Sequence, residues 1–307
     1  MTVEEAVTVF ARGFAFGRSF THPFVATHVV PGLWVLSDAP RHAGEYRGDE
    51  VIAYDTDRHG LGAEDVHALA RRYARARFTL GVVRDLATAD GGADSGADGG
   101  ADSGADGGAR AVFKGLGYRL IATEPLMVRD LGGDDDDRVD GRDGDPIDGD
   151  NHDRRDERHG LAPGNASSLA APRPVAGDPR ITVARVTTVA AAVRLAKAAR
   201  RRQILPEHLT ADPPPMRSYT ALDGALPIGW VSSVVVGEHT WCSNLFVTAP
   251  YRRRGIGGAL MRRMLADDAV AGSRANVLLA SRTGALLYPT VGYRAIGELL
   301  IFTPPRR

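Results

Sequence analysis

Cysteine is nearly absent from this sequence: Cys242 is the only one, so no disulfide can form within the chain. Long hydrophobic runs are also absent, and no stretch approaches the ~20 apolar residues of a membrane-spanning helix. The chain begins with MTVEEAVTVFARGF, which lacks the basic start and the apolar block of a signal peptide. These absences favour a cytoplasmic protein that does not associate with membranes.

Acidic residues are concentrated in two segments, which hides the charge of the remainder behind a net charge of zero. Residues 90–108 hold five Asp and no basic residue, and residues 131–160 hold eleven Asp, one Glu and five Arg. The two segments carry −5 and −7, so the rest of the chain carries about +12. A basic folded part favours anionic ligands such as nucleotides, although an Arg-rich surface alone would give the same balance. No aromatic residues are interleaved with this charge, and we expect no nucleic-acid partner.

The same acidic segments divide the 307-residue chain, whose length suits about two domains of roughly 100–200 residues each. Residues 89–109 repeat GGADSGAD and hold too little apolar surface to offset the entropy of ordering. Neither acidic segment has the repeat pattern or the terminal Glu of a calcium loop, and we expect no metal. We therefore predict a first domain over 1–131 with a disordered insert at 89–109, an acidic flexible linker over 132–178, and a second domain over 179–307.

Hydrophobic periodicity predicts the secondary structure of both domains. In the first, helices are expected over 4–16, 63–75 and 111–116, and strands over 33–36, 51–54, 78–83 and 118–128. In the second, helices are expected over 188–202, 257–266 and 283–291, and strands over 218–222, 228–236, 239–247, 276–280 and 293–303. This alternation predicts an α/β (α+β) fold, with a mixed central sheet and helices on both faces.

The sharpest local signal is a glycine-rich turn within the segment LFVTAPYRRRGIGGALMRRML, residues 245–265. The start of a helix presents unpaired N–H groups and the positive end of the helix dipole, and glycines let a bulky anion approach. Such a turn suits a pyrophosphate group. It lacks the Lys-Ser/Thr of a Walker A loop, and Leu260 replaces the third Gly of a Rossmann fingerprint. By itself the turn is also compatible with a helix start packed closely on a sheet.

Two motifs together resemble those of one enzyme superfamily. Arg252-x-x-Gly255-x-Gly257, five residues after a strand ending at Val247, resembles motif A of the GCN5-related N-acetyltransferases (GNAT). Downstream, the segment LLASRTGALLYPTVGYRAIGELLIF resembles motif B of that superfamily. The motifs follow in the family's order, and the resemblance covers about 125 residues. In the first domain, VFKGLGYRLIATEPLMVRDL echoes LYPTVGYRAIGELLIFTP of the second, which predicts tandem GNAT-like domains.

The resemblance implies that acetyl-CoA lies between two splayed parallel strands, here 239–247 and 276–280, and serves as the acyl donor. The implied reaction is that of an acyltransferase for groups other than amino-acyl groups: an amine of a small molecule or protein attacks the thioester directly in a ternary complex. For this chain we also allow for a homodimer. The residues that the resemblance assigns to acetyl-CoA are Phe246, Val247, Thr248, Arg252, Arg253, Arg254, Gly255, Ile256, Gly257, Gly258 and Ser281.

Family members commonly use a Tyr at the position of Tyr288 to protonate the leaving thiolate; the alternative for this residue is a core aromatic on the last helix. The base that takes the amine proton is less evident. Glu238 precedes the first splayed strand, and Glu207 lies in ILPEHLT, where the family has a substrate-facing helix; solvated surface roles are the alternative for both. Cys242 is better explained as a small buried hydrophobe than as a nucleophile.

The first domain has no counterpart of R-x-x-G-x-G. At the corresponding place Gly60 and Gly62 precede Glu64 and Asp65, whose carboxylates would cap the helix and repel a pyrophosphate. We therefore expect a degenerate GNAT-like domain that binds no CoA and either serves structurally or walls the acceptor pocket. The alternative to an enzyme is a CoA-binding pseudoenzyme or a partner-binding module.

Overall fold

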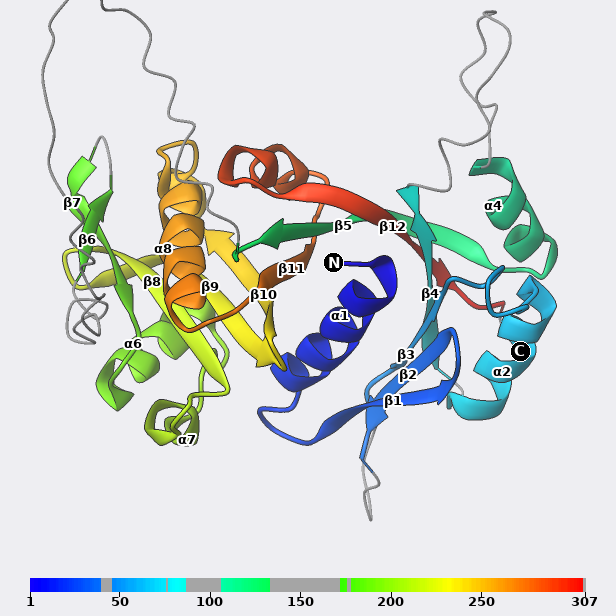
Figure 1. Cartoon of the computed structure of the whole chain (residues 1–307). Coiled ribbons are helices and arrows are strands. Elements are labelled where there is room, and N and C mark those ends of the chain that lie inside the picture. Colours follow the sequence, from blue (N-terminus) through cyan, green and yellow to red (C-terminus); the bar gives the residue numbers. More distant parts are fainter. Residues whose placement is uncertain (40–45, 76, 87–105, 133–171, 176–177, 306–307) are drawn as a thin grey trace, which may run out of the picture.

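The computed structural model describes residues 1–39, 46–75, 77–86, 106–132, 172–175 and 178–305 (Figure 1). Most of the predicted insert and of the predicted linker therefore lies outside the described residues. Two ordered elements nevertheless fall inside these segments. The helix Asp106–Gly115 begins within the predicted insert, and the strand Arg173–Val175 lies within the predicted linker, so ordered structure extends further into both segments than expected.

The described strands form one 12-stranded mixed sheet in the order β1-β2-β3-β4-β12-β5-β11-β10-β9-β8-β7-β6. The strands are β1 (Phe24–Val30), β2 (Leu33–Asp38), β3 (Asp49–Tyr54), β4 (Phe78–Asp85), β5 (Arg119–Asp130), β6 (Arg173–Val175), β7 (Asp178–Arg185), β8 (Met216–Asp223), β9 (Leu226–Val236), β10 (His239–Val247), β11 (Ala275–Leu279) and β12 (Arg294–Thr303). The helices are α1 (Val3–Arg18), α2 (Ala63–Tyr73), α4 (Asp106–Gly115), α6 (Val189–Ala199), α7 (Pro206–Thr210) and α8 (Ile256–Val270), with the 3-10 helices η2 (Ala249–Tyr251), η3 (Gly284–Leu286) and η4 (Tyr288–Val291). The expected α/β fold with helices on both faces of a mixed sheet is confirmed.

The two halves of the chain repeat one order of elements and exchange their last strands. Each half contains a parallel strand pair joined by a helix, β3-α2-β4 in the first and β10-α8-β11 in the second. The final strand of each half then crosses over: β5 pairs with β11, and β12 pairs with β4, while β5 and β12 pair antiparallel with each other. Figure 1 shows these two long strands joining the halves. The halves therefore share one sheet.

The repeated Gly-Tyr-Arg sequence marks the start of each exchanged strand. Gly117 and Gly292 both have φ near +84°, a backbone conformation that favours glycine at the end of a helical turn. The tyrosines that follow, Tyr118 and Tyr293, are both buried. The repeated sequence therefore marks the equivalent starts of β5 and β12, the two strands at the centre of the sheet.

Helix α1 lies between the two halves and packs against both (Figure 1). A capping box between Thr2 and Glu5 fixes its first turn. Gly13 allows it to approach β10, because a Cβ there would lie 2.3 Å from the Cβ of Trp241. One core cluster surrounds α1, a second lies under α8, and a third lies under α2 and α4.

A buried polar network ties α8 to the sheet. The Asp268 carboxylate, fully buried, accepts hydrogen bonds from Arg217, Ser233, Thr240 and Asn276 on β8, β9, β10 and β11. Removing one partner of such a buried charge pair costs about 3–5 kcal/mol. The network holds the C-terminal end of α8, and so fixes where the helix begins.

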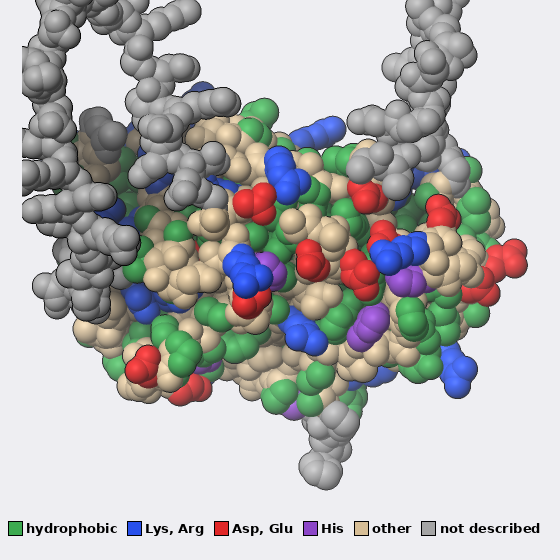
Figure 2. Space-filling model, viewed as in Figure 1, with side chains coloured by type: hydrophobic (Ala, Val, Ile, Leu, Met, Phe, Trp, Pro, Cys, Tyr) green, Lys and Arg blue, Asp and Glu red, His purple; other side chains and the backbone are tan. Residues whose placement is uncertain are grey.

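Surface charge is mixed on the face shown in Figure 2, where acidic and basic side chains are intermingled. Among the described residues, none of the helices reaches the length and apolar character of a bilayer-spanning segment. Within the same residues, no group of three or more His, Cys, Asp or Glu side chains could hold a metal ion.

Candidate active site

The parallel strands of the second half diverge. Strand β10 pairs with β11 only from His239 to Trp241, although β10 continues to Val247 along its other neighbour, β9. The parallel pair of the first half, β3 with β4, stays closed from Asp49 to Tyr54. The sheet therefore opens at one of its two parallel pairs, which confirms the expected splayed strands and places them where the sequence motifs lie.

A bulge in β10 sets which backbone groups face this gap. Asn244 has φ near +60°, and the register with β9 shifts between Ser243 and Phe246. The N–H of Thr248 donates to the carbonyl of Ile228 on β9 at 2.9 Å. Because backbone groups alternate in direction along a strand, those of Val247 point towards the gap. Of Phe246, Val247 and Thr248, the three β10-end residues that the resemblance assigns to acetyl-CoA, Val247 thus offers its backbone there.

The neighbours of Val247 contribute in other ways. The Phe246 ring stacks on Trp230 with 4.6 Å between centroids and stays partly exposed. The Val247 carbonyl accepts from Nε of Arg252 at 2.9 Å, which fixes the path from β10 into the turn.

The glycine-rich turn starts α8 directly after the gap. Gly255 is the residue before the helix and has φ near +75°. The first bond within the helix runs from Ala259 N–H to the Gly255 carbonyl, so the three preceding amides, those of residues 256–258, are left without helical acceptors. No acidic residue occupies the first turn. Packing against Leu287, 3.2 Å from where a Gly257 Cβ would be, holds the turn beside η4.

Arginines surround this helix start. Arg252 lies 5.8 Å from the Phe246 ring centroid, and Arg254 lies over Tyr251 at 5.2 Å while pairing with Asp178. Arg262, one turn into α8, has its guanidinium 3.2 Å from where a Cβ on Gly258 would be. The turn therefore combines free amides, a positive helix end and cationic side chains, which together suit a diphosphate.

Tyr288 lies on η4 in the apolar cluster under α8. Burial raises the pKa of its phenol well above the usual range, and the nearby Cys242 and Glu124 act in the same direction. The phenol is therefore protonated at neutral pH and can donate a proton. The Cys242 thiol is buried, contacts Met261, and has its pKa raised by burial, which fits a structural thiol.

The two candidate bases are both exposed, and Glu238 lies away from the gap. Glu238 sits at the turn before β10, at the opposite end from Val247, where it is exposed and pairs with Arg274 at 3.1 Å. Glu207 is exposed on α7. Ser281 accepts a hydrogen bond from Gly284 N–H at 3.3 Å and so caps the turn after β11. The structure brings Tyr288, Val247 and the glycine turn together and leaves Glu238 at the opposite end of β10.

Glu124 is a site residue that sequence reasoning missed. It lies on β5, where the carbonyl of the next residue, Pro125, accepts from Ala280 N–H at the end of β11. Its carboxylate lines a pocket of about 300 Å³ with Phe14 and Glu50, and burial raises its pKa. Only the strand exchange places this first-half residue beside the gap, and no local pattern signals that exchange.

Comparison with known proteins agrees with this geometry. Residues 215–295 match the acetyltransferase (GNAT) domain family. Among curated proteins, no sequence matches the chain. A GCN5-related N-acetyltransferase from Kribbella flavida matches with a TM-score of 0.50 and 14% identity over 99% of this chain and 96% of that one.

Two further solved structures are similar with lower TM-scores. A GCN5-related N-acetyltransferase from Sphaerobacter thermophilus has a TM-score of 0.46 and 17% identity over 90% of this chain and 77% of that one. A tandem GNAT protein from the clavulanic acid biosynthesis pathway has a TM-score of 0.43 and 15% identity over 99% and 96% of the two chains. The matched residues 215–295 contain the diverging strands, the glycine turn and Tyr288, and this part of the chain is a GNAT acetyltransferase domain.

Proposed function

We propose that this protein is an N-acetyltransferase that transfers the acetyl group of acetyl-CoA to an amine of a small molecule or protein within a ternary complex. One observation carries the proposal: the sheet opens beside β10 at the point where an acid-free, glycine-rich helix start follows. The pantetheine arm would pair with the backbone of Val247, and the pyrophosphate would bind the amides of residues 256–258 and the surrounding arginines.

This arrangement aims the thioester at the gap between β10 and β11. The attacking amine forms the new C–N bond, and the C–S bond then breaks to release a thiolate. Tyr288, held protonated by its burial, would donate a proton to that thiolate. Attack of an amine on a thioester requires no metal.

Calorimetric titration of the full chain with acetyl-CoA tests the donor site, and thiol release over a panel of amines tests the transfer. Gly258→Asp puts a carboxylate in the first turn of α8, next to Arg262, and we expect it to raise the acetyl-CoA Kd at least tenfold, equivalent to about 1.4 kcal/mol. Ala266→Asp adds the same charge at an exposed position further along α8 and should leave the Kd unchanged.

Failure of the unmodified protein to bind acetyl-CoA at millimolar concentration would overturn the proposal. Binding without thiol release for any amine would instead identify a CoA-binding pseudoenzyme.

A further inference from the structure

A pocket of about 300 Å³ lies on the α1 side of the sheet, between α1 and strands β3, β4, β5 and β12. It reaches Leu279, the last residue of β11, and so borders the gap. Phe10 and Phe14 of α1 form one wall. The lining is mostly apolar and contains two carboxylates, those of Glu50 and Glu124.

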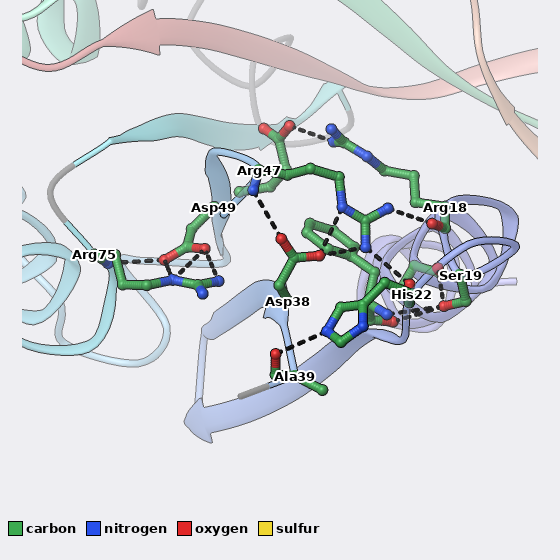
Figure 3. Close-up of polar contacts among 11 residues, drawn as sticks. Arg18, Ser19, His22, Asp38, Ala39, Arg47, Asp49 and Arg75 are labelled. Carbon is green, nitrogen blue, oxygen red and sulfur yellow. Dashed lines mark hydrogen bonds and ion pairs between the residues drawn. The ribbon is translucent and has the colours of Figure 1, made fainter. Parts of the chain in front are cut away.

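The charge of Glu50 is compensated. Its carboxylate pairs with Arg18 at 2.8 Å, and Arg18 lies over the Phe14 ring at 5.1 Å. Arg47 in turn binds the carbonyl of Arg18 and the buried carboxylate of Asp38 (Figure 3). These contacts fix the C-terminal end of α1 on the first half of the sheet and make this wall rigid.

Glu124 is not compensated in this way. Among the described residues, no hydrogen bond or ion pair reaches its carboxylate, although the side chain is half-buried. An unpaired carboxylate that is shielded from bulk water is unfavourable. Such a group is therefore typical of sites where a ligand supplies the opposite charge or gives a proton to the carboxylate.

Glu124 and Tyr288 approach the gap from opposite faces of the sheet. Side chains alternate along β5, and Leu126 and Val128 belong to the core around α1, so Glu124 faces α1 as well. Tyr288 belongs to the cluster under α8. The charge of Glu124 nevertheless raises the pKa of Tyr288, so the two groups are within electrostatic reach of each other.

We propose that this pocket is the acceptor site, that it takes a small primary amine on an apolar carbon skeleton, and that the Glu124 carboxylate accepts the amine proton. The inference rests on the proposed acetyl transfer. The first half of the chain would then supply the acceptor wall and the base, and the second half the donor site and the acid. The volume is at the small end of ligand pockets, roughly 300–1,000 Å³, which favours a small acceptor.

The protons balance as follows. An incoming ammonium group loses one proton to Glu124, which passes it to solvent. The neutral nitrogen attacks the thioester carbon and then loses a second proton to Glu124. The C–S bond breaks. The thiolate takes the phenolic proton of Tyr288, and return of the proton from Glu124 to the phenolate restores both groups. The products are the acetylated amine and coenzyme A.

Glu124→Gln, in the full chain, removes the base and keeps the shape of the side chain. The probes are straight-chain alkylamines of three to six carbons and, separately, aniline, which is already neutral at the assay pH. We expect kcat/KM for the alkylamines to fall about 100-fold or more, and by a much smaller factor for aniline, because general base catalysis contributes about 10²–10⁴-fold. Glu124→Asp should restore part of the alkylamine activity.

Glu298→Gln is the matched control. Glu298 lies on β12 beside Leu299, the residue paired with Glu124, but its carboxylate bonds to Arg84 and does not line the pocket. The rates of Glu298→Gln should stay within about twofold of those of the unmodified protein.

Equal losses for alkylamines and aniline, or no loss in Glu124→Gln, would overturn the assignment of Glu124. Acetyl-CoA binding without acetylation of any probe amine would overturn the acceptor class, whereas loss of acetyl-CoA binding by the unmodified protein would refute the proposed function itself.

Discussion

At the residue scale, burial decides what each group at the gap can do. Tyr288 is shielded from water, and its raised pKa keeps the phenol protonated at neutral and mildly alkaline pH. We predict that Tyr288→Phe lowers kcat about 100-fold while the acetyl-CoA Kd changes less than about threefold, because only proton donation to the thiolate is lost. Steady-state rates and calorimetric titration measure the two effects.

The control for this prediction is Tyr118→Phe. Tyr118 is also buried, but its phenol bonds to His67 in the first half, far from the glycine turn in sequence and on the other side of the exchanged strands. Its loss should cost about 1 kcal/mol of stability and leave turnover intact. Unchanged kcat in Tyr288→Phe would show that the phenol is a packing group only.

A base role for Glu124 predicts that kcat/KM falls at low pH. Burial raises the pKa of Glu124 above the usual value of 4.5, and the titratable groups near it are Glu50 in the same pocket and Tyr288 across the gap. A base must be deprotonated, so kcat/KM with the alkylamines should fall as the pH drops through this raised pKa, because these are the substrates whose rate depends most on Glu124. This fall should disappear in Glu124→Gln; a fall with the same midpoint in that variant would assign it to another group.

The same burial has a stability consequence of opposite sign. A carboxyl whose folded pKa is raised loses stability as the pH rises from its unfolded to its folded pKa, because the charged form is the one that burial disfavours. Glu124→Gln should therefore melt at a higher temperature than the unmodified protein at pH 7, and the gain should vanish below about pH 4.

At the scale of elements, the sequence pattern predicted the bounds of elements that depend on neighbouring residues alone. Strand β10 begins and ends where the alternation of residues 239–247 placed it, and the glycine turn starts α8 as expected. The edge strand β1 was missed, because its exposed and buried positions do not alternate strictly. The predicted helix over 283–291 is instead two 3-10 turns, with Pro289 in the first turn of the second.

Helix α1 shows how a single glycine positions an element. Gly13 packs on Trp241, and an added Cβ would lie 2.3 Å from the Trp241 Cβ, so Gly13→Ala should destabilise the protein by about 1–3 kcal/mol through overpacking. Gly17 lies on the same helix, and a Cβ added there would be 3.8 Å from its nearest neighbour, Ser243 Oγ. Gly17→Ala should therefore stabilise by about 0.5–1 kcal/mol, the ordinary helix effect. Urea unfolding compares the two, and a gain in both would show that α1 does not pack this closely.

At the scale of the molecule, the exchange of β5 and β12 could not be predicted from the sequence. Alternation along a strand reports which face is buried, and it does not report which strand lies alongside. The echo of Gly-Tyr-Arg indicated two related halves, but the partners of each strand depend on residues more than a hundred positions away, as in the pairing of Leu299 with Glu124. For the same reason Glu124 was absent from the expected site, although Tyr288 and the turn were found.

Because each half completes the sheet of the other, the two should unfold together. Leu80 is fully buried on β4 and pairs in register with Phe302 of the exchanged strand β12. Leu80→Ala should cost about 2–5 kcal/mol. In a Trp34→Phe background the remaining tryptophans, Trp230 and Trp241, lie on β9 and β10, so their fluorescence reports on the second half and on its contact with α1. We expect Leu80→Ala to lower the urea midpoint of their fluorescence as much as that of far-ultraviolet circular dichroism.

Val112→Ala, on the exposed face of α4, is the control and should move neither midpoint. A fluorescence midpoint that stays in place while the dichroism midpoint falls would show that the halves unfold independently, despite the strands they share.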